Sequence, residues 1–270
     1  MKSIWPIAAI SFKEGIRNRA LYGIFILAVL FFAATILMSG MVMHEVGKVA
    51  VDMALSAISF SGLLLVLFVG INLMAKDLDR KTIYMVLSRP VSRAQYIVGK
   101  FFGNSLLIIV AVFVLSIGGI ASIGAVKLGH PSYFTNFTWS LVVLAIVLII
   151  FKLILLSAIS LFFASFASTS FVTLVLTVVT YLIGESIAGI KALVGAADVV
   201  GIKVSGLSAS AIQFAYYCFP NLSFFNIKTQ AAHGLPIELS YLFFVALYAC
   251  VYSCLAIVLA VAVFSRREFP

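Results

Sequence analysis

The fold is decided by the stretch from Phe137 to Ala164, which reads FTWSLVVLAIVLIIFKLILLSAISLFFA and contains one charged residue, Lys152. A helix needs about 20 mostly apolar residues to cross a bilayer, and this stretch exceeds that length. Only helices and closed barrels satisfy their backbone hydrogen bonds in lipid. The apolar residues are continuous rather than alternating, so the stretch predicts a transmembrane helix.

Similar uncharged runs recur along the chain. After the first stretch, small and polar residues from Ser165 to Ser170 mark a break, and no further charge occurs before Glu185. The predicted spans are 20–43, 53–75, 101–126, 137–164, 170–190 and 239–264. The sequence therefore predicts an all-α integral membrane protein, with six transmembrane helices in a single transmembrane domain over 1–270.

The composition excludes most other classes of protein. Of the 270 residues, 64% are apolar and 10% are charged, and the mean hydropathy is +1.22. Soluble domains have about 45–50% apolar and about 25% charged residues. This difference excludes an ordinary soluble enzyme, a disordered chain and a nucleic-acid-binding domain. Cys250 and Cys254 lie one helical turn apart in an apolar run, which favours small buried side chains over a disulfide framework.

The distribution of charge predicts the orientation of the spans. The net charge is +9. With six spans, one side of the membrane holds twelve Lys and Arg residues against four acidic ones, and the other side is neutral. Lys and Arg collect on the cytoplasmic side of membrane proteins. We therefore expect both termini and the loop 76–100 in the cytoplasm.

The segment 204–227 is also uncharged, but it contains Pro220, Asn221 and Asn226. A seventh span here would move Arg266 and Arg267 to the outside, which would contradict the expected excess of Lys and Arg on the cytoplasmic side. We interpret the segment as a pair of interfacial or re-entrant helices. It belongs to an extracytoplasmic helical segment, 191–238, between spans five and six.

Residues 1–19 predict an amphipathic helix at the inner membrane interface. Apolar residues recur there every four positions, at Ile4, Ala8, Phe12 and Ile16, while cations occupy the polar face. Such helices lie in the headgroup region with their apolar face toward the acyl chains. A simple basic anchor is the alternative interpretation.

The loop from Lys76 to Lys100 has the most distinctive pattern in the chain. Its apolar run, Thr82 to Leu87, is followed by Pro90, which prevents one continuous helix. Ser92 predicts the N-cap of a second helix leading into the third span. A purely solvated basic loop would not need the apolar run, so the loop is predicted to dock on the membrane or in a protein groove.

This loop resembles that of the permeases of type-2 ABC transporters, nearest the branch assigned to multicopper-enzyme maturation and nitrous oxide reductase assembly. The matching residues are Asp77, Asp79, Lys81-Thr82-Ile83, Leu87 to Arg93, Gly99 and Lys100. The ends of the chain, 12–19 and 264–269, are similar to that family too. The resemblance implies a coupling helix between spans two and three that docks on a cytosolic ATPase. The implied docking residues are Asp77, Asp79, Arg80, Lys81, Thr82, Ile83, Tyr84, Leu87, Ser88, Arg89, Pro90, Val91, Ser92 and Arg93.

The resemblance also implies the partners. Two permease chains, identical or related, would pair with two ATPases in a prokaryotic plasma membrane, and the ATPases would bind ATP and Mg. A phosphate-binding loop needs a Gly-x-x-x-x-Gly-Lys-Ser/Thr pattern. Gly99-Lys100 is followed by Phe101 and has Ala94 at the place of the first Gly. We therefore expect no catalytic residue, cofactor or metal site in this chain.

Charges inside the spans are costly and are usually paired or functional. Lys152 lies 16 residues before Ser168 and Glu185 lies 17 after it, so both are about 24 Å from the predicted turn. The two could pair, reach water separately, or contact substrate. Thr173, Thr177 and Tyr181 share the helix face of Glu185, and such polar stripes usually pack against a neighbouring helix.

Other functions fit the sequence less well. A secondary transporter would favour internal repeats, and an intramembrane enzyme would need more reactive groups than these spans hold. A membrane assembly factor stays open as an alternative. His44 beside Met41 and Met43 would suit copper, although a helix end with flexible apolar residues is the commoner meaning of that pattern.

Overall fold

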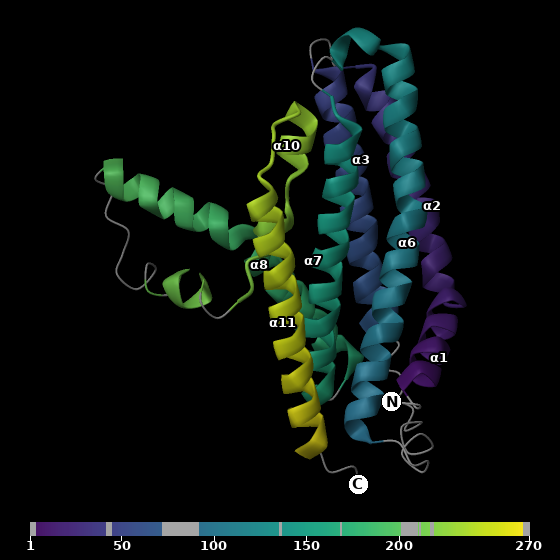
Figure 1. The fold of residues 1–270 in the computed structure, drawn as a ribbon, viewed down its shortest axis with the longest axis vertical. Coiled ribbons are helices and arrows are strands. Elements are labelled where there is room, and N and C mark those ends of the chain that lie inside the picture. Colours follow the sequence, from purple (N-terminus) through teal and green to yellow (C-terminus); the bar gives the residue numbers. More distant parts are fainter. Residues whose placement is uncertain are drawn as a thin grey trace.

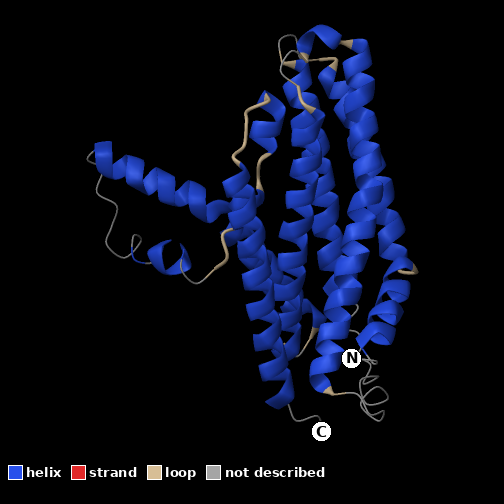
Figure 2. Ribbon diagram, viewed as in Figure 1, coloured by secondary structure: helices blue, strands red, loops and turns tan. Residues whose placement is uncertain are grey.

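The computed structural model describes residues 4–41, 45–71, 92–134, 137–167, 169–200, 210, 212–216 and 219–266. Every regular element in these ranges is a helix (Figure 2). Six are long and apolar enough to cross a membrane, which confirms the predicted fold class. They are α2 (Arg19–Ser39), α3 (Val46–Leu65) with the π-helix η1 (Val66–Gly70), α6 (Arg93–Gly129), α7 (Trp139–Phe166), α8 (Ser170–Val200) and α11 (Leu239–Arg266).

Shorter helices connect or precede these spans. They are α1 (Ile4–Ile16), the 3-10 helices η2 (Pro131–Tyr133) and η3 (Leu222–Phe225), and α10 (Lys228–His233). Figure 1 shows the long helices standing side by side, with both chain ends at the same end of the bundle. The C-terminal part of α8 projects sideways from the bundle in the same view. Of the described parts of the segment 204–227, Leu222, Phe225 and Ile227 are buried in the main hydrophobic core, and none of these parts forms a seventh span.

The third span begins earlier than the hydropathy predicts. The helix α6 starts at Arg93 instead of residue 101, so the last eight residues of the expected loop are helical. A capping box fixes this start, because Ser92 Oγ accepts from Gln95 N at 3.2 Å and Gln95 Oε1 accepts from Ser92 N at 3.1 Å. The N-cap role predicted for Ser92 is confirmed.

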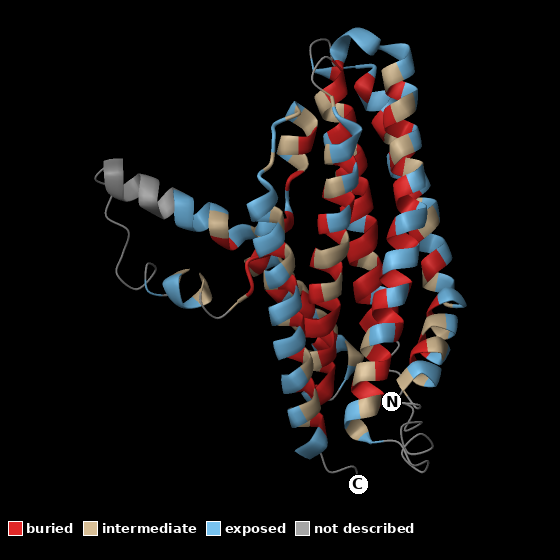
Figure 3. Cartoon of the chain, in the orientation of Figure 1, coloured by how far each residue is buried: buried red, intermediate tan, exposed pale blue. Residues whose placement is uncertain are grey.

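Burial divides the helices into a central and a peripheral group. In their most apolar windows α3 is 72% buried and α7 is 67% buried, whereas α11 is 22% buried. Figure 3 shows the buried residues concentrated where α3, α6 and α7 meet. The outer faces of α2, α8 and α11 are rich in large exposed hydrophobic side chains. Such faces suit lipid as their solvent, in agreement with the membrane assignment.

The N-terminal helix α1 is seated against the first turns of α6. Two glycines on α6, Gly99 and Gly103, let the helices approach closely. A methyl group at Gly103 would lie 2.7 Å from the carbonyl oxygen of Ala8 and 2.6 Å from Ser11 Cβ. Ala8 and Ser11 are accordingly buried. The four-residue glycine spacing is the small-xxx-small pattern that favours close helix packing in membranes.

Candidate functional site

A buried ion pair joins α7 to α8, the helix that follows it in the chain. The ammonium of Lys152, on α7, lies 2.9 Å from Glu185 Oε2, on α8. The Lys152 side chain is only 3% exposed, while that of Glu185 is 26% exposed. Of the three possibilities open for these charges, the structure shows pairing. The nearly equal distances from the α7–α8 turn bring the two residues to one level, as the sequence spacing predicts.

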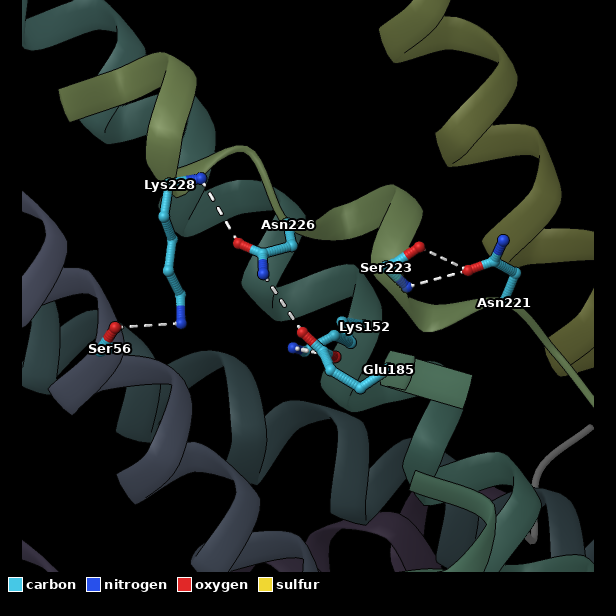
Figure 4. A network of polar contacts seen from close by, with 7 residues as sticks. All are labelled: Ser56, Lys152, Glu185, Asn221, Ser223, Asn226 and Lys228. Atoms are coloured by element: carbon cyan, nitrogen blue, oxygen red, sulfur yellow. Dashed lines mark hydrogen bonds and ion pairs between the residues drawn. The ribbon is translucent and has the colours of Figure 1, made fainter. Parts of the chain in front are cut away.

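The other carboxylate oxygen of Glu185 binds the segment that follows α8. Asn226 Nδ2 donates to Glu185 Oε1 at 3.2 Å (Figure 4). Two residues further on, the ammonium of Lys228 donates to Ser56 Oγ, on α3, at 3.2 Å. Burial, together with the nearby Lys152 ammonium, lowers the pKa of Lys228. We call Ser56, Lys152, Glu185, Asn226 and Lys228 the polar network.

The segment reaches this position because a glycine leaves room for it. A methyl group at Gly184 would lie 2.6 Å from the carbonyl oxygen of Pro220. The same methyl group would meet the side chain of Leu222, which is fully buried, as is Phe225. Asn221 Oδ1 accepts from Ser223 N at 3.1 Å and so shapes the turn into η3. Pro220, Asn221 and Asn226, which argue against a span in the sequence, are thus residues that fold this segment against the bundle.

The rest of the polar stripe on α8 serves packing. Thr173 and Thr177 are buried, and each hydroxyl donates to a backbone carbonyl one turn earlier in its own helix. Tyr181 lies beside the network, with the Lys152 ammonium 5.4 Å from its ring centroid. The hydroxyls of the two threonines are therefore satisfied without a ligand, whereas Tyr181 shares the environment of Lys152.

The polar network holds helices together. The Ser56 hydroxyl accepts from the Lys228 ammonium at 3.2 Å, and this bond joins α3 to α10. Within the described ranges no three His, Cys, Asp or Glu residues gather as metal ligands. The network ties α3, α7 and α8 to the segment 221–233 through charge-assisted bonds. Moving that segment therefore requires these bonds to break or to move with it.

A second candidate site lies at the end of the bundle that holds the chain ends. The predicted docking residues from Asp77 to Val91 lie outside the described residues, so the structure leaves their role untested. The helices on either side of that loop are described. Before it, the π-helix ends at Gly70, whose carbonyl oxygen accepts from Asn104 Nδ2, on α6, at 3.4 Å. Single-turn π-helices frequently occur at functional sites.

After the loop, Arg93 holds the end of the last span. Its guanidinium donates to the carbonyl oxygens of Phe264 and Ser265, at 3.3 and 2.9 Å. The ring of Tyr96 stacks on that of Phe264, with centroids 6.0 Å apart. A cation at a helix C-terminus satisfies carbonyls that have no partner within the helix. The first turn of α6 is thus attached to α11, as its next turns are attached to α1.

Comparison with protein families identifies the chain. The profile of a family described as "ABC-2 family transporter protein" matches residues 5–269, which is nearly the whole length. The chain belongs to the ABC-2 transporter family. It is therefore a multi-pass membrane protein and a permease, the transport subunit of an ABC transporter. A search of curated proteins found no match.

The attachment of Arg93 gives the first testable prediction for this ABC-2 permease. Replacing Arg93 with Met removes both hydrogen bonds to α11 and should fray its last turn. Hydrogen exchange of the amides of residues 262–266 should become faster, while the middle of α11 stays protected. Arg93→Lys should give an intermediate result, because an ammonium keeps the charge but sits on a shorter side chain than the Nη1 atom that donates to both carbonyls. Unchanged exchange in Arg93→Met would contradict the cap.

Several residues of the permease escaped the sequence analysis. Ser56, Asn226 and Lys228 come from separate parts of the chain, and no spacing rule connects them. In the sequence, Asn221 and Asn226 indicate only that an uncharged segment contains polar residues. The glycine pair at Gly99 and Gly103 carried a readable signal, because a four-residue spacing of small residues on an apolar helix indicates close packing.

Proposed function

We propose that this permease couples ATP hydrolysis on a separate cytosolic ATPase to the export or release of a substrate across the membrane. The observation that carries the proposal is its membership of the ABC-2 family over residues 5–269. The geometry at the start of α6 supports it. The helix α6, which begins at the last predicted docking residue, Arg93, is bonded to α11 and packed on α1, so a push on the docking residues would reach three helices together.

The proposed mechanism is a two-state equilibrium. ATP binding would favour one arrangement of the ATPase, and the docked loop would bias the permease toward the matching state. The capping box gives α6 a fixed beginning, so displacement of the loop would move the helix as a body instead of unwinding it. The polar network, which includes Lys152 at the middle of α7, would then hold or release the segment 221–233.

The assembly follows from the family resemblance. Two permease chains, identical or related, would pair with two ATPases that bind ATP and Mg. Both termini and the loop 76–100 would face the cytoplasm of a prokaryotic cell, because the cations gather at that side. The branch assigned to multicopper-enzyme maturation, including nitrous oxide reductase assembly, is the first place to look for the substrate, and neighbouring genes would identify it.

Purification of the chain in mild detergent tests the coupling. The permease should bring an ABC ATPase with it in about equal amounts, and Arg89→Glu should abolish this, because a docking cation is reversed. Lys127→Glu makes the same charge change at the opposite end of the bundle and should retain the ATPase. Arg93 is unsuitable for this test because its side chain binds α11. Transport by the chain alone, with no ATPase bound, would refute the proposal.

A further inference from the structure

The outward face of α11 carries an open groove beside η3. Its volume is about 480 Å³. Aromatic rings form most of its wall, namely those of Phe224, Tyr241, Phe244, Tyr248 and Tyr252. Val245 is buried, whereas Phe244 is 65% exposed. The groove is therefore open toward the surroundings of the bundle, and it lies apart from the polar network.

Hydrogen bonds hold the tyrosine rings in place. The hydroxyl of Tyr248 accepts from Asn221 N at 2.8 Å, and that of Tyr241 donates to the carbonyl oxygen of Phe224 at 2.6 Å. The polar ends of both side chains are thus bound to the segment 221–224. What remains for the groove is ring surface, which makes its lining apolar and pre-formed.

The groove has the length of one membrane leaflet. Its residues on α11 run from Tyr241 to Tyr252, which is about 16 Å along the helix axis at 1.5 Å per residue. The hydrocarbon core of a bilayer is about 30 Å thick, so each leaflet contributes about half of that. These residues occupy the half of α11 that lies away from the chain ends. The groove would therefore face the acyl chains of one leaflet.

A second transmembrane helix fits the groove poorly. Helix interfaces in membranes prefer small residues. On α11, Ala249, Ser253, Ala256 and Ala260 are buried within the bundle, whereas the small side chains of Cys250 and Cys254 are exposed. The face beside the groove carries large side chains, including Leu247.

We propose that this groove binds one acyl chain of a membrane phospholipid, in the leaflet opposite the chain termini. Lipid tails are as apolar as the protein surface, so the preference comes from shape and van der Waals contact rather than from the hydrophobic effect. A flexible hydrocarbon chain can follow an aromatic groove between large exposed side chains such as Phe244 and Leu247 more closely than a rigid helix can. The bound chain also contacts Phe224, and so it supports η3 from the lipid side.

Photolabelling in a bilayer tests the proposal. The purified protein is placed in phosphatidylcholine vesicles that contain a trace of phosphatidylcholine with a diazirine in one acyl chain. After illumination, mass spectrometry should find labels concentrated on residues 241–252 and few on Leu255, Val258 and Leu259, which are exposed on the same helix. Val251→Trp fills the groove and should lower the label on 241–252 about tenfold, which corresponds to about 1.4 kcal/mol of lost binding.

Val258→Trp is the matched control. Val258 is 66% exposed on the same helix and does not line the groove, so its replacement should leave the labelling unchanged. If Val251→Trp does not fold, Leu247→Trp fills the groove from another position. Even labelling along α11, or full labelling of a folded groove-filled variant, would overturn the proposal. So would efficient cross-linking of a photoreactive residue at position 247 to a second copy of the chain.

Discussion

Glu185→Gln is expected to destabilise the permease by about 3 kcal/mol, the usual cost of removing one partner of a buried ion pair. The change leaves the Lys152 ammonium, whose side chain is 3% exposed, without its counter-charge. Lys152→Met should cost less, because the remaining carboxylate is 26% exposed and keeps its bond from Asn226. Unfolding by SDS titration in mixed micelles measures both changes.

The double variant tests whether the two charges act as a pair. Lys152→Met combined with Glu185→Gln removes both charges, so it should be more stable than Glu185→Gln alone and should recover part of the transport activity. Additive losses would contradict direct coupling. The surface pair of Lys48 and Glu45, 2.7 Å apart, is the matched control, and neutralising it should change stability little.

Gly103→Leu is expected to displace α1 from α6 and to abolish coupled transport. Even the methyl group of Gly103→Ala would meet the backbone of α1 at Ala8, and backbone atoms cannot move aside without shifting the helix. Overpacking of this kind costs about 1–3 kcal/mol, and the leucine side chain is larger still. Without this contact, a movement of the first turns of α6 would no longer reach α1.

Maleimide labelling measures the displacement directly. Ser11→Cys, in a chain whose three native cysteines are replaced by serine, should be protected because residue 11 is only 1% exposed. Adding Gly103→Leu should make that cysteine reactive. Gly124→Ala is the control on the same helix, since a methyl group there meets nothing within 4 Å. Persistent protection of Cys at position 11 in Gly103→Leu would show that α1 does not depend on this glycine.

The sequence predicted what depends on local chemistry. Uncharged runs located the spans, and the serine before Arg93 located a helix start. The hydropathy placed that start at residue 101 because Arg93 and Lys100 interrupt the apolar pattern. Both cations are used inside the fold: Arg93 binds the end of α11, and Lys100 is buried, 3.9 Å from Glu14. A window average counts such charges as solvated, although tertiary contacts satisfy them.

The candidate site depended on contacts between distant parts of the chain. The pairing of Lys152 with Glu185 was one of three open possibilities, since equal distances from a turn permit a contact without requiring it. The partners in the segment after α8 could not be read, because Asn226 and Lys228 meet Glu185 and Ser56 only once Gly184 admits that segment. The docking loop itself remains a prediction.

The ion pair between α7 and α8 has a consequence for how the chain is made. A lysine at the centre of a helix costs about 2.5–3.5 kcal/mol when the translocon releases it into lipid. Its counter-charge is 33 residues further along the chain, so α7 would leave the ribosome before Glu185 can neutralise it. The two helices are therefore best delivered to the bilayer together, as one preassembled hairpin, and Asn226 reaches that hairpin last.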